Sequence, residues 1–315
     1  MRVLLILDPL PQIKTYKDTS YAMMVAAGER GHEIHVCGPG ELWFDGAQVC
    51  VAATRLELQG MGHDDWYRLA DPDEQPLQHF DATLMRKDPP FDLEYLYATM
   101  LLERAVAQGA RVFNDPRAIR DHNEKLAITE FPQFAAQTIV TRDPKRLRAF
   151  VKEHGQAIFK LLDGMGGTSI FQAREGDANL SVIIETMNQF GARSVMAQRY
   201  LPEISAGDKR ILLIAGAVVP FCLARIPQEG ESRGNLAAGG TARAQPLSAR
   251  DREIAEALAQ PLWERGLLLV GLDVIGGCLT EINVTSPTCF QEITQQTGYD
   301  VAAQFVTALE AAVAR

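Results

Sequence analysis

The chain has 315 residues, which is enough for about two domains, and its 47% hydrophobic and 23% charged residues are typical of an ordinary globular protein. This composition excludes a disordered, fibrous or disulfide-scaffold protein. The formal net charge of −9 makes a general electrostatic attraction to nucleic acid or to an anionic membrane unfavourable. We therefore expect neither as a partner, and any bound anion must be held by a local cluster of cations.

The five cysteines are odd in number and scattered, and no two of them form a C-x-x-C pair. They therefore indicate neither a disulfide framework nor a zinc site, and a reducing cytoplasm suits them best. The first apolar run, Val3 to Leu7, is too short for the core of a signal peptide. The longest, Ile211 to Ala224, contains Gly216 and Pro220 and falls short of the roughly 20 residues that span a bilayer. We predict a soluble cytoplasmic protein.

The first part of the chain alternates between apolar runs and helical segments, which is typical of an α/β layer. A continuous apolar run such as 3–7 is expected of a strand that is buried on both faces. The predicted elements are a strand at 3–7, a helix capped by Asp18 that ends near 30, a strand at 33–37, a hairpin around 45–46, a polar stretch over 59–78, a strand at 82–85, a helix over 92–108 and a strand at 111–113.

The pattern changes near residue 120, where we place the boundary between a domain at 1–120 and a domain at 121–315. Mostly antiparallel strands with flanking helices make the second part α+β. Its predicted elements are a helix over 143–155 and strands at 157–162, 169–173, 195–200, 209–215, 218–226, 267–275 and 278–284. The glycine-rich segment 227–242 is predicted to be a mobile lid, although such loops are often only flexible linkers.

Three residues with oxygen-bearing side chains, Asp273, Glu281 and Asn283, lie near a pair of glycines at 276–277. Residues two apart on a strand share one face about 7 Å apart, and Mg²⁺ prefers such hard oxygen ligands. The alternative is that they are solvated polar positions at strand ends. A regular two-residue turn would put Asp273 and Glu281 on opposite faces, so a shared metal site requires a three-residue loop or a β-bulge.

Lys160 lies in an apolar strand that runs directly into the glycine loop Asp163-Gly-Met-Gly-Gly-Thr-Ser. A buried lysine needs an anionic partner, and the backbone N–H groups of such a loop can cradle phosphate. Equally, this lysine could extend to solvent at the edge of the sheet before an ordinary turn. The loop leads into a strand, so it is not a Rossmann fingerprint, and the sequence has no phosphate-binding G-x-x-x-x-G-K-[ST] motif.

Four arginines could build an anion site in this acidic chain: Arg86, Arg210, Arg225 and Arg233. Arg86 follows a predicted strand, Arg210 and Arg225 lie on neighbouring predicted strands, and Arg233 lies in the glycine-rich segment. The planar guanidinium fork binds carboxylate and phosphate well, although any one of these residues alone would more often be at the surface.

Together these segments resemble the bacterial glutathione synthetases, a family within the ATP-grasp superfamily, and the resemblance covers essentially the whole chain. The segments that carry it are RKDPPFD (86–92), NEKL (123–126), LLDGMGGTSIF (161–171), CLARIP (222–227), RGNLAAGG (233–240) and TEINVTSPT (280–288). The first and the last two are specific to that family, whereas a lysine, a glycine loop and E-x-N would indicate only the superfamily.

The resemblance implies an α/β N-terminal substrate domain followed by an ATP-grasp domain, with ATP held between two small antiparallel sheets. It implies ligation of γ-glutamylcysteine to glycine through an acyl phosphate, with ATP converted to ADP and phosphate. Mg²⁺, or Mn²⁺ in its place, would be required, and the chain would form a homo-oligomer, a dimer or a tetramer. The sequence departs from the family at Thr241, where an arginine is expected, with Arg243 two residues later.

The resemblance also implies roles for individual residues. ATP would contact Lys125, Lys160, Gly166, Gly167, Gln198, Leu201 and Asp208. The metal would be held by Asp273, Glu281 and Asn283, the chemistry assisted by Arg210, Arg225 and Arg233, and the other substrates bound by Arg86, Asn235, Ser286 and Thr288. Two alternatives stay open: another ATP-grasp ligase that joins a different carboxylate and amine, and a non-catalytic nucleotide-binding regulator.

Overall fold

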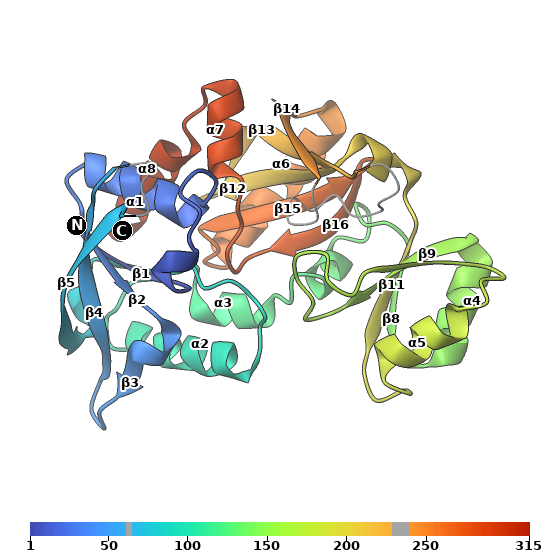
Figure 1. Cartoon of the computed structure of the whole chain (residues 1–315), viewed down its shortest axis with the longest axis horizontal. Helices are drawn as coiled ribbons and strands as arrows, with labels where there is room; N and C mark the ends of the chain where they lie inside the picture. The colour runs from blue at the N-terminus through green and yellow to red at the C-terminus, as the bar shows by residue number, and fades with distance from the viewer. Residues whose placement is uncertain (61–64, 229–239) are drawn as a thin grey trace.

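The computed structural model of the chain describes residues 1–60, 65–228 and 240–315, and its strands form three sheets (Figure 1). A seven-stranded sheet belongs to the first third of the chain, and a four-stranded and a five-stranded sheet follow. We call them the N-terminal, central and C-terminal sheets. No helix within these ranges has both the length and the apolar character needed to cross a membrane.

The N-terminal sheet is mixed, with a parallel centre flanked by an antiparallel edge. Its strands lie in the order β3-β4-β2-β1-β6-β7, with β5 also paired to β4. Strands β2, β1, β6 and β7 run parallel to one another, and β4 runs antiparallel to β2, β3 and β5. Their bounds are β1 (Arg2–Ile6), β2 (Glu33–Cys37), β3 (Leu42–Phe44), β4 (Val49–Leu58), β5 (Tyr67–Pro76), β6 (Ala82–Met85) and β7 (Val112–Phe113).

Two helices of the first part begin where their capping aspartates predict. Asp18 caps α1 (Thr19–Glu29) by accepting a hydrogen bond from the backbone N–H of Tyr21, and Asp92 caps α2 (Leu93–Val106) in the same way. The predicted α/β layer, including its hairpin between β3 and β4, is confirmed.

The central and C-terminal sheets are antiparallel, as predicted for the second part. The central sheet has the order β10-β9-β11-β8, and the C-terminal sheet has the order β14-β13-β12-β15-β16. The strands are β8 (Thr138–Thr141), β9 (Gln156–Leu161), β10 (Phe171–Arg174), β11 (Val195–Arg199), β12 (Asp208–Ile214), β13 (Ala217–Ile226), β14 (Thr241–Pro246), β15 (Leu269–Ile275) and β16 (Cys278–Asn283). The helices between residues 114 and 264 are α3 (Pro116–Asp121), α4 (Pro144–His154), α5 (Leu180–Asn188) and α6 (Ala249–Glu264).

The sequence-based prediction missed three strands, β5, β8 and β14, and all three lie at sheet edges. An edge strand has a neighbour on one side only, so its side chains need not alternate between apolar and polar. Most of β5 is exposed, which is why the polar stretch at 59–78 hid it. The predicted lid at 227–242 is wrong at its end, because Thr241 and Ala242 belong to β14. Residues 229–239 of that segment lie outside the described residues.

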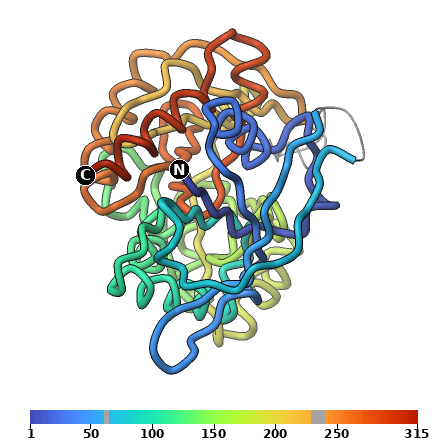
Figure 2. The backbone as a smooth tube through the Cα atoms, turned by 90° about the vertical axis from the view of Figure 1, so that its left-hand side faces the viewer, coloured from blue at the N-terminus to red at the C-terminus, as the bar shows by residue number. Residues whose placement is uncertain are grey.

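The end of the chain returns to its beginning. Helices α7 (Phe290–Thr297) and α8 (Val301–Val313) pack with α1, and one apolar core includes Leu5, Met24, Phe290 and Phe305. Both termini lie at the left-hand end of the molecule in Figure 1, which is the end that faces the viewer in Figure 2. The segment just before α7 hydrogen-bonds to Arg86 and Asp88, which follow β6 of the N-terminal sheet.

Candidate active site

A cavity of about 520 Å³ is lined by strands of both the central and the C-terminal sheets, and by residues of the N-terminal part. Fourteen of the seventeen residues that the sequence singled out line it: Lys125, Lys160, Gly166, Gly167, Gln198, Leu201, Asp208, Arg210, Arg225, Asp273, Glu281, Asn283, Ser286 and Thr288. Arg233 and Asn235 lie outside the described residues, and Arg86 is described but does not line the cavity.

The hairpin of β15 and β16 brings two carboxylates onto one face by means of a β-bulge. Its turn is the two-residue one, with Ile275 opposite Cys278, but the register shifts beyond Val274 so that Asp273 lies opposite Glu281. Thr280 is the extra residue, and its hydroxyl donates a hydrogen bond of 3.1 Å to the backbone oxygen of Asp273. The sequence predicted that a shared site needs an odd loop or a bulge, and the structure has the bulge.

Three buried charged residues and the partly buried Asp208 form one network on the C-terminal sheet. Nε of Arg210 donates to Oδ1 of Asp273 over 2.6 Å, and a terminal nitrogen of Arg225 lies 3.0 Å from Oδ2 of Asp273 and 2.6 Å from Asp208. Burial would raise the pKa of Asp273, but the two guanidinium groups outweigh it and hold that pKa well below its usual range. Burial raises the pKa of Asp208 to about 6, although Arg225 opposes this shift.

Lys160 faces the cavity from β9 of the central sheet. Its surroundings differ from those of the charged residues on the C-terminal sheet. Its Nζ donates a hydrogen bond of 2.6 Å to Oε1 of Gln198, a neutral acceptor on the neighbouring strand β11. Burial lowers the pKa of Lys160, because the nearby carboxylates, Glu281 foremost, only partly offset it. This cation is therefore buried without a hydrogen-bonded carboxylate among the described residues.

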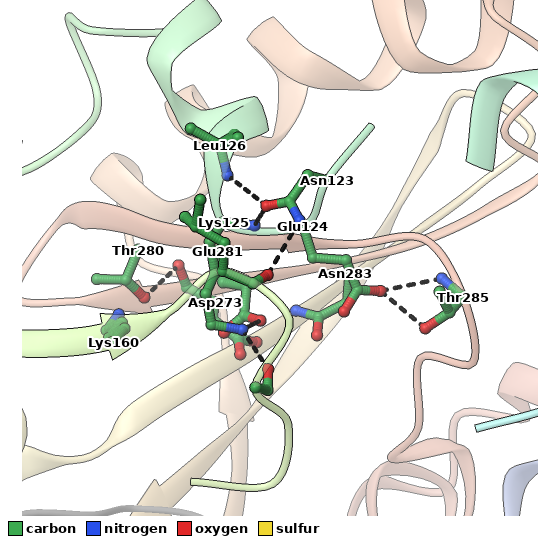
Figure 3. Close-up of polar contacts among 12 residues, drawn as sticks. Asn123, Glu124, Lys125, Leu126, Lys160, Asp273, Thr280, Glu281, Asn283 and Thr285 are labelled. Carbon is green, nitrogen blue, oxygen red and sulfur yellow. Dashed lines mark hydrogen bonds and ion pairs between the residues drawn. The ribbon is translucent and has the colours of Figure 1, made fainter. Parts of the chain in front are cut away.

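Residues 123–125 connect the two sides of the cavity (Figure 3). Nζ of Lys125 lies 2.9 Å from Glu281 on β16 and 2.6 Å from the backbone oxygen of Gly164 in the glycine loop. Asn123 donates to the backbone oxygen of Leu162, at the start of the same loop. The loop itself turns at Gly166 and Gly167, whose positive φ angles of 60° and 80° favour glycine.

The comparisons with known proteins cover the whole chain. The family model for the prokaryotic glutathione synthetase N-terminal domain matches residues 1–120, and the model for the ATP-grasp domain of the same family matches residues 124–298. The chain belongs to the prokaryotic glutathione synthetase family. A glutathione synthetase of Ralstonia nicotianae is 61% identical over 100% of this chain and 97% of its own length, and that of Bordetella parapertussis is 57% identical over 99% of each.

Solved structures resemble the chain in fold. The D-cycloserine synthetase DcsG covers 99% of each chain with a TM-score of 0.68 at 14% identity. The ATP-grasp ligase PsnB, complexed with a minimal precursor, Mg and ADP, covers 99% of this chain and 98% of its own with a TM-score of 0.63 at 17% identity. The predicted family, the ATP-grasp fold and the activity of an ATP-dependent ligase are confirmed.

Arg86 is buried, and the structure uses its guanidinium inside the protein. Nε donates to the hydroxyl of Ser20 over 3.1 Å, and a terminal nitrogen donates to the backbone oxygen of Pro287 over 3.0 Å. Arg86 therefore lies behind the cavity wall that includes Ser286 and Thr288, and reaches the cavity only through Pro287. Its predicted role as a contact of the peptide substrate stays a prediction.

Sequence reasoning missed a set of carboxylates that also line the cavity of this family member: Asp18, Asp88, Glu124 and Glu292. Asp88 and Glu124 lie inside two of the family segments, RKDPPFD and NEKL, so those motifs held the only available signal. Burial and then the neighbouring Glu281 raise the pKa of Glu124, against the hydrogen bonds that it accepts from Val284 and Thr285.

The three predicted metal ligands fit Mg²⁺ by their chemistry, because all offer oxygen. Asp273 and Glu281 oppose each other across the hairpin, while Asn283 donates through its amide nitrogen to the backbone oxygen of Gly271. That hydrogen bond leaves the amide oxygen of Asn283 without a donor among the described residues. The described part of the chain contains no group of three histidine, cysteine or acidic residues placed to hold a metal.

Proposed function

We propose that the chain joins γ-glutamylcysteine to glycine, and that ATP first phosphorylates the peptide carboxylate. The observation that carries this proposal is that one cavity combines buried cations with paired carboxylates, in a chain matched along its whole length by enzymes named glutathione synthetase. Amide formation from a carboxylate needs activation, and phosphoryl transfer needs positioning and charge neutralisation more than an enzyme nucleophile.

Lys160 and Lys125 are the groups that we assign to the ATP phosphates. Lys160 has only the neutral Gln198 as its hydrogen-bonding partner among the described residues, so it can offer its full charge to an anion. The N–H groups of Gly166 and Gly167 would add donors from the glycine loop. Gln198 and Leu201, where β11 ends, would bind the adenine, with Asp208 close by on β12.

Asp273, Glu281 and Asn283 would hold Mg²⁺, or Mn²⁺ in its place. When bound, the ion would supply positive charge to the phosphate oxygens. The protein holds two of these side chains ready, because Arg210 and Arg225 fix Asp273 and Lys125 fixes Glu281. Such preorganisation lowers the reorganisation that the reaction itself requires.

Arg210 and Arg225 are proposed to stabilise the negative charge that develops when the glycine amine attacks the acyl phosphate. Both reach the cavity while paired to Asp273, so they are fixed in place before substrate arrives. Ser286 and Thr288 are proposed contacts of the peptide substrate. Arg233 and Asn235 keep their proposed roles in chemistry and substrate binding, outside the described residues.

Three further proposals concern the protein as a whole. The five cysteines are free thiols, which supports a reducing cytoplasm as its location. We propose a homo-oligomer, a dimer or a tetramer, without nucleic acid or membrane as a partner. The boundary near residue 120 stays a proposal, because α8 packs on α1 and so joins the two parts in one core.

The decisive experiment measures ADP release and product formation together. Purified protein with ATP, Mg²⁺, γ-glutamylcysteine and glycine should release one ADP for each glutathione formed. Omission of either γ-glutamylcysteine or glycine should abolish the steady release of ADP. ADP release with a different carboxylate and amine, and none with this pair, would favour the alternative ligase. Nucleotide binding without turnover on any such pair would favour the non-catalytic regulator.

A further inference from the structure

One short segment, residues 284–288, contains the proposed peptide contacts Ser286 and Thr288, and its residues 285–288 line the cavity. It follows β16 directly and has no sheet partner of its own. Its position is set instead by side chains from elsewhere in the chain. Arg86 binds the backbone oxygen of Pro287, and Asp88 accepts a hydrogen bond from the hydroxyl of Ser286.

Glu124 is the acceptor for the first half of the segment, while Asn114 donates a hydrogen bond of 2.8 Å to the backbone oxygen of Val284. Oε1 of Glu124 accepts three hydrogen bonds, from the backbone N–H of Val284 at 2.9 Å, from the backbone N–H of Thr285 at 3.0 Å and from the hydroxyl of Thr285 at 2.8 Å. The backbone oxygen of Glu124 also accepts a hydrogen bond of 2.9 Å from the N–H of Ile282. Figure 3 shows the two hydrogen bonds between Glu124 and Thr285.

The two N–H groups and the hydroxyl that donate hydrogen bonds to Glu124 belong to buried residues. Val284 is 0% exposed and Thr285 is 6% exposed. Without Glu124 these donors would lose their partner in a site that water reaches poorly, and an unsatisfied buried donor is costly. The segment would then move to find other acceptors, and Ser286 and Thr288 would move with it.

We propose that Glu124 is a positioning residue for the peptide substrate, because its Oε1 sets the conformation of residues 284–288. Glu124 acts through Thr285 and Val284 rather than on the reacting atoms. The role requires an oxygen acceptor at this point and does not require a charge. This inference rests on the proposed function, since it assigns the 284–288 wall to γ-glutamylcysteine.

Two substitutions separate the acceptor from the charge. Glu124→Ala removes the acceptor, and we expect the KM for γ-glutamylcysteine to rise roughly ten- to hundredfold, the scale of a lost buried hydrogen-bond network. Glu124→Gln keeps an amide oxygen in reach of the same three donors, and we expect its KM to stay within about threefold of the wild type. The KM for ATP should change less than about threefold in both variants.

Two outcomes would overturn the proposal. If Glu124→Gln is as defective as Glu124→Ala, the carboxylate charge is what matters, and Glu124 acts on metal or substrate directly. If Glu124→Ala raises the KM for ATP as much as that for the peptide, or changes neither, the segment is not specifically positioned by this residue. A thermal unfolding curve of each variant shows whether the fold is retained, and Glu124→Gln provides the answer if Glu124→Ala does not fold.

Partner and control variants sharpen the test. Thr285→Val removes one of the three donors and keeps the side-chain volume, so it should raise the peptide KM by less than Glu124→Ala. Glu130→Ala is the matched control, because this glutamate lies at the end of the adjoining helical turn and pairs with Arg265 at the surface. The wild type separates the two levels of inference: if it makes no glutathione, the proposed function fails, whereas a working wild type with unaffected variants refutes only the role of Glu124.

Discussion

The two sheets that line the cavity present their charges in opposite ways. On the C-terminal sheet, Arg210 and Arg225 share Asp273, and Arg225 also binds Asp208, so the buried charges balance one another. On the central sheet, Lys160 is buried beside the neutral Gln198. We call these two sides of the cavity its walls. The wall of the C-terminal sheet is already paired and contributes to the fold, whereas the wall of the central sheet presents a buried cation that we propose binds an anionic ligand.

The largest expected effect comes from Asp273→Asn, which breaks the assembled network. Two buried guanidinium groups would lose their shared counter-ion, so the free energy of unfolding should fall by about 3 kcal/mol. Activity should fall more than about a hundredfold, because a proposed metal ligand is lost as well. Urea unfolding and steady-state kinetics measure both. The exposed Asp121→Asn, which breaks a surface pair with Arg117, is the control and should cost less than about 1 kcal/mol. Equal losses in the two variants would contradict the account.

Lys160→Met tests the other wall, where the expected effect is on binding rather than on folding. The KM for ATP should rise at least about tenfold through loss of one charge-assisted contact. The melting temperature should stay the same or rise, since removal of a buried lysine relieves its desolvation. Lys152→Met, on the exposed side of α4, is the control and should change neither quantity. Unchanged ATP kinetics would contradict the assignment of Lys160 to ATP binding. A loss of stability like that of Asp273→Asn would show that Lys160, too, stabilises the fold.

The features that could be predicted from the sequence are those whose interacting residues lie close together in the chain. Buried strands and capped helices are encoded locally, so β2, β6, α1 and α2 were predicted almost to the residue. The edge strands β5, β8 and β14 carry no such pattern and were missed, whereas the edge strands β7, β10 and β16 were predicted. The contacts of Arg86 could not be predicted from the sequence. Its partners Ser20 and Pro287 are 66 and 201 residues away in the chain, and no local pattern indicates them.

The hairpin shows an intermediate case. The alternation of the strands and the glycine pair left two possible connections between them, a regular two-residue turn or a shifted register. A shared metal site would require the shifted register. The extra residue, Thr280, could not be identified, because its hydroxyl bond to the backbone of Asp273 is a tertiary detail of the bulge.

The pH dependence of stability offers a finer test of the assembled wall. The pKa of Asp208 is raised to about 6, so the folded protein binds a proton between pH 4 and 6 that the unfolded chain does not bind. This group therefore adds stability at low pH, and that stability is lost as the pH rises through about 6. In Asp208→Asn this contribution is absent, so the stability of the variant relative to the wild type should increase by about 2 kcal/mol between pH 4.5 and 7. Urea unfolding of the ligand-free protein at several pH values measures the change, and a difference that is independent of pH would refute it.

The smallest predicted effect concerns the bulge that brings Asp273 opposite Glu281. Thr280→Val keeps the volume of the side chain and removes its hydrogen bond to the backbone of Asp273. The free energy of unfolding should fall by about 1 kcal/mol, and the register should persist because Glu281 is still held by Lys125. A loss of activity as large as that of Asp273→Asn would show that this hydroxyl alone holds the register.

The central claim, that one wall holds the metal and the other the phosphates, is tested most directly by a diffraction experiment with ADP and Mn²⁺, whose anomalous signal locates the ion. We predict the ion in contact with Asp273, Glu281 and Asn283, and the phosphates against Lys160 and the glycine loop. An ion bound elsewhere, or phosphates that contact the arginine network and leave Lys160 with Gln198 alone, would contradict the assignment of the two walls.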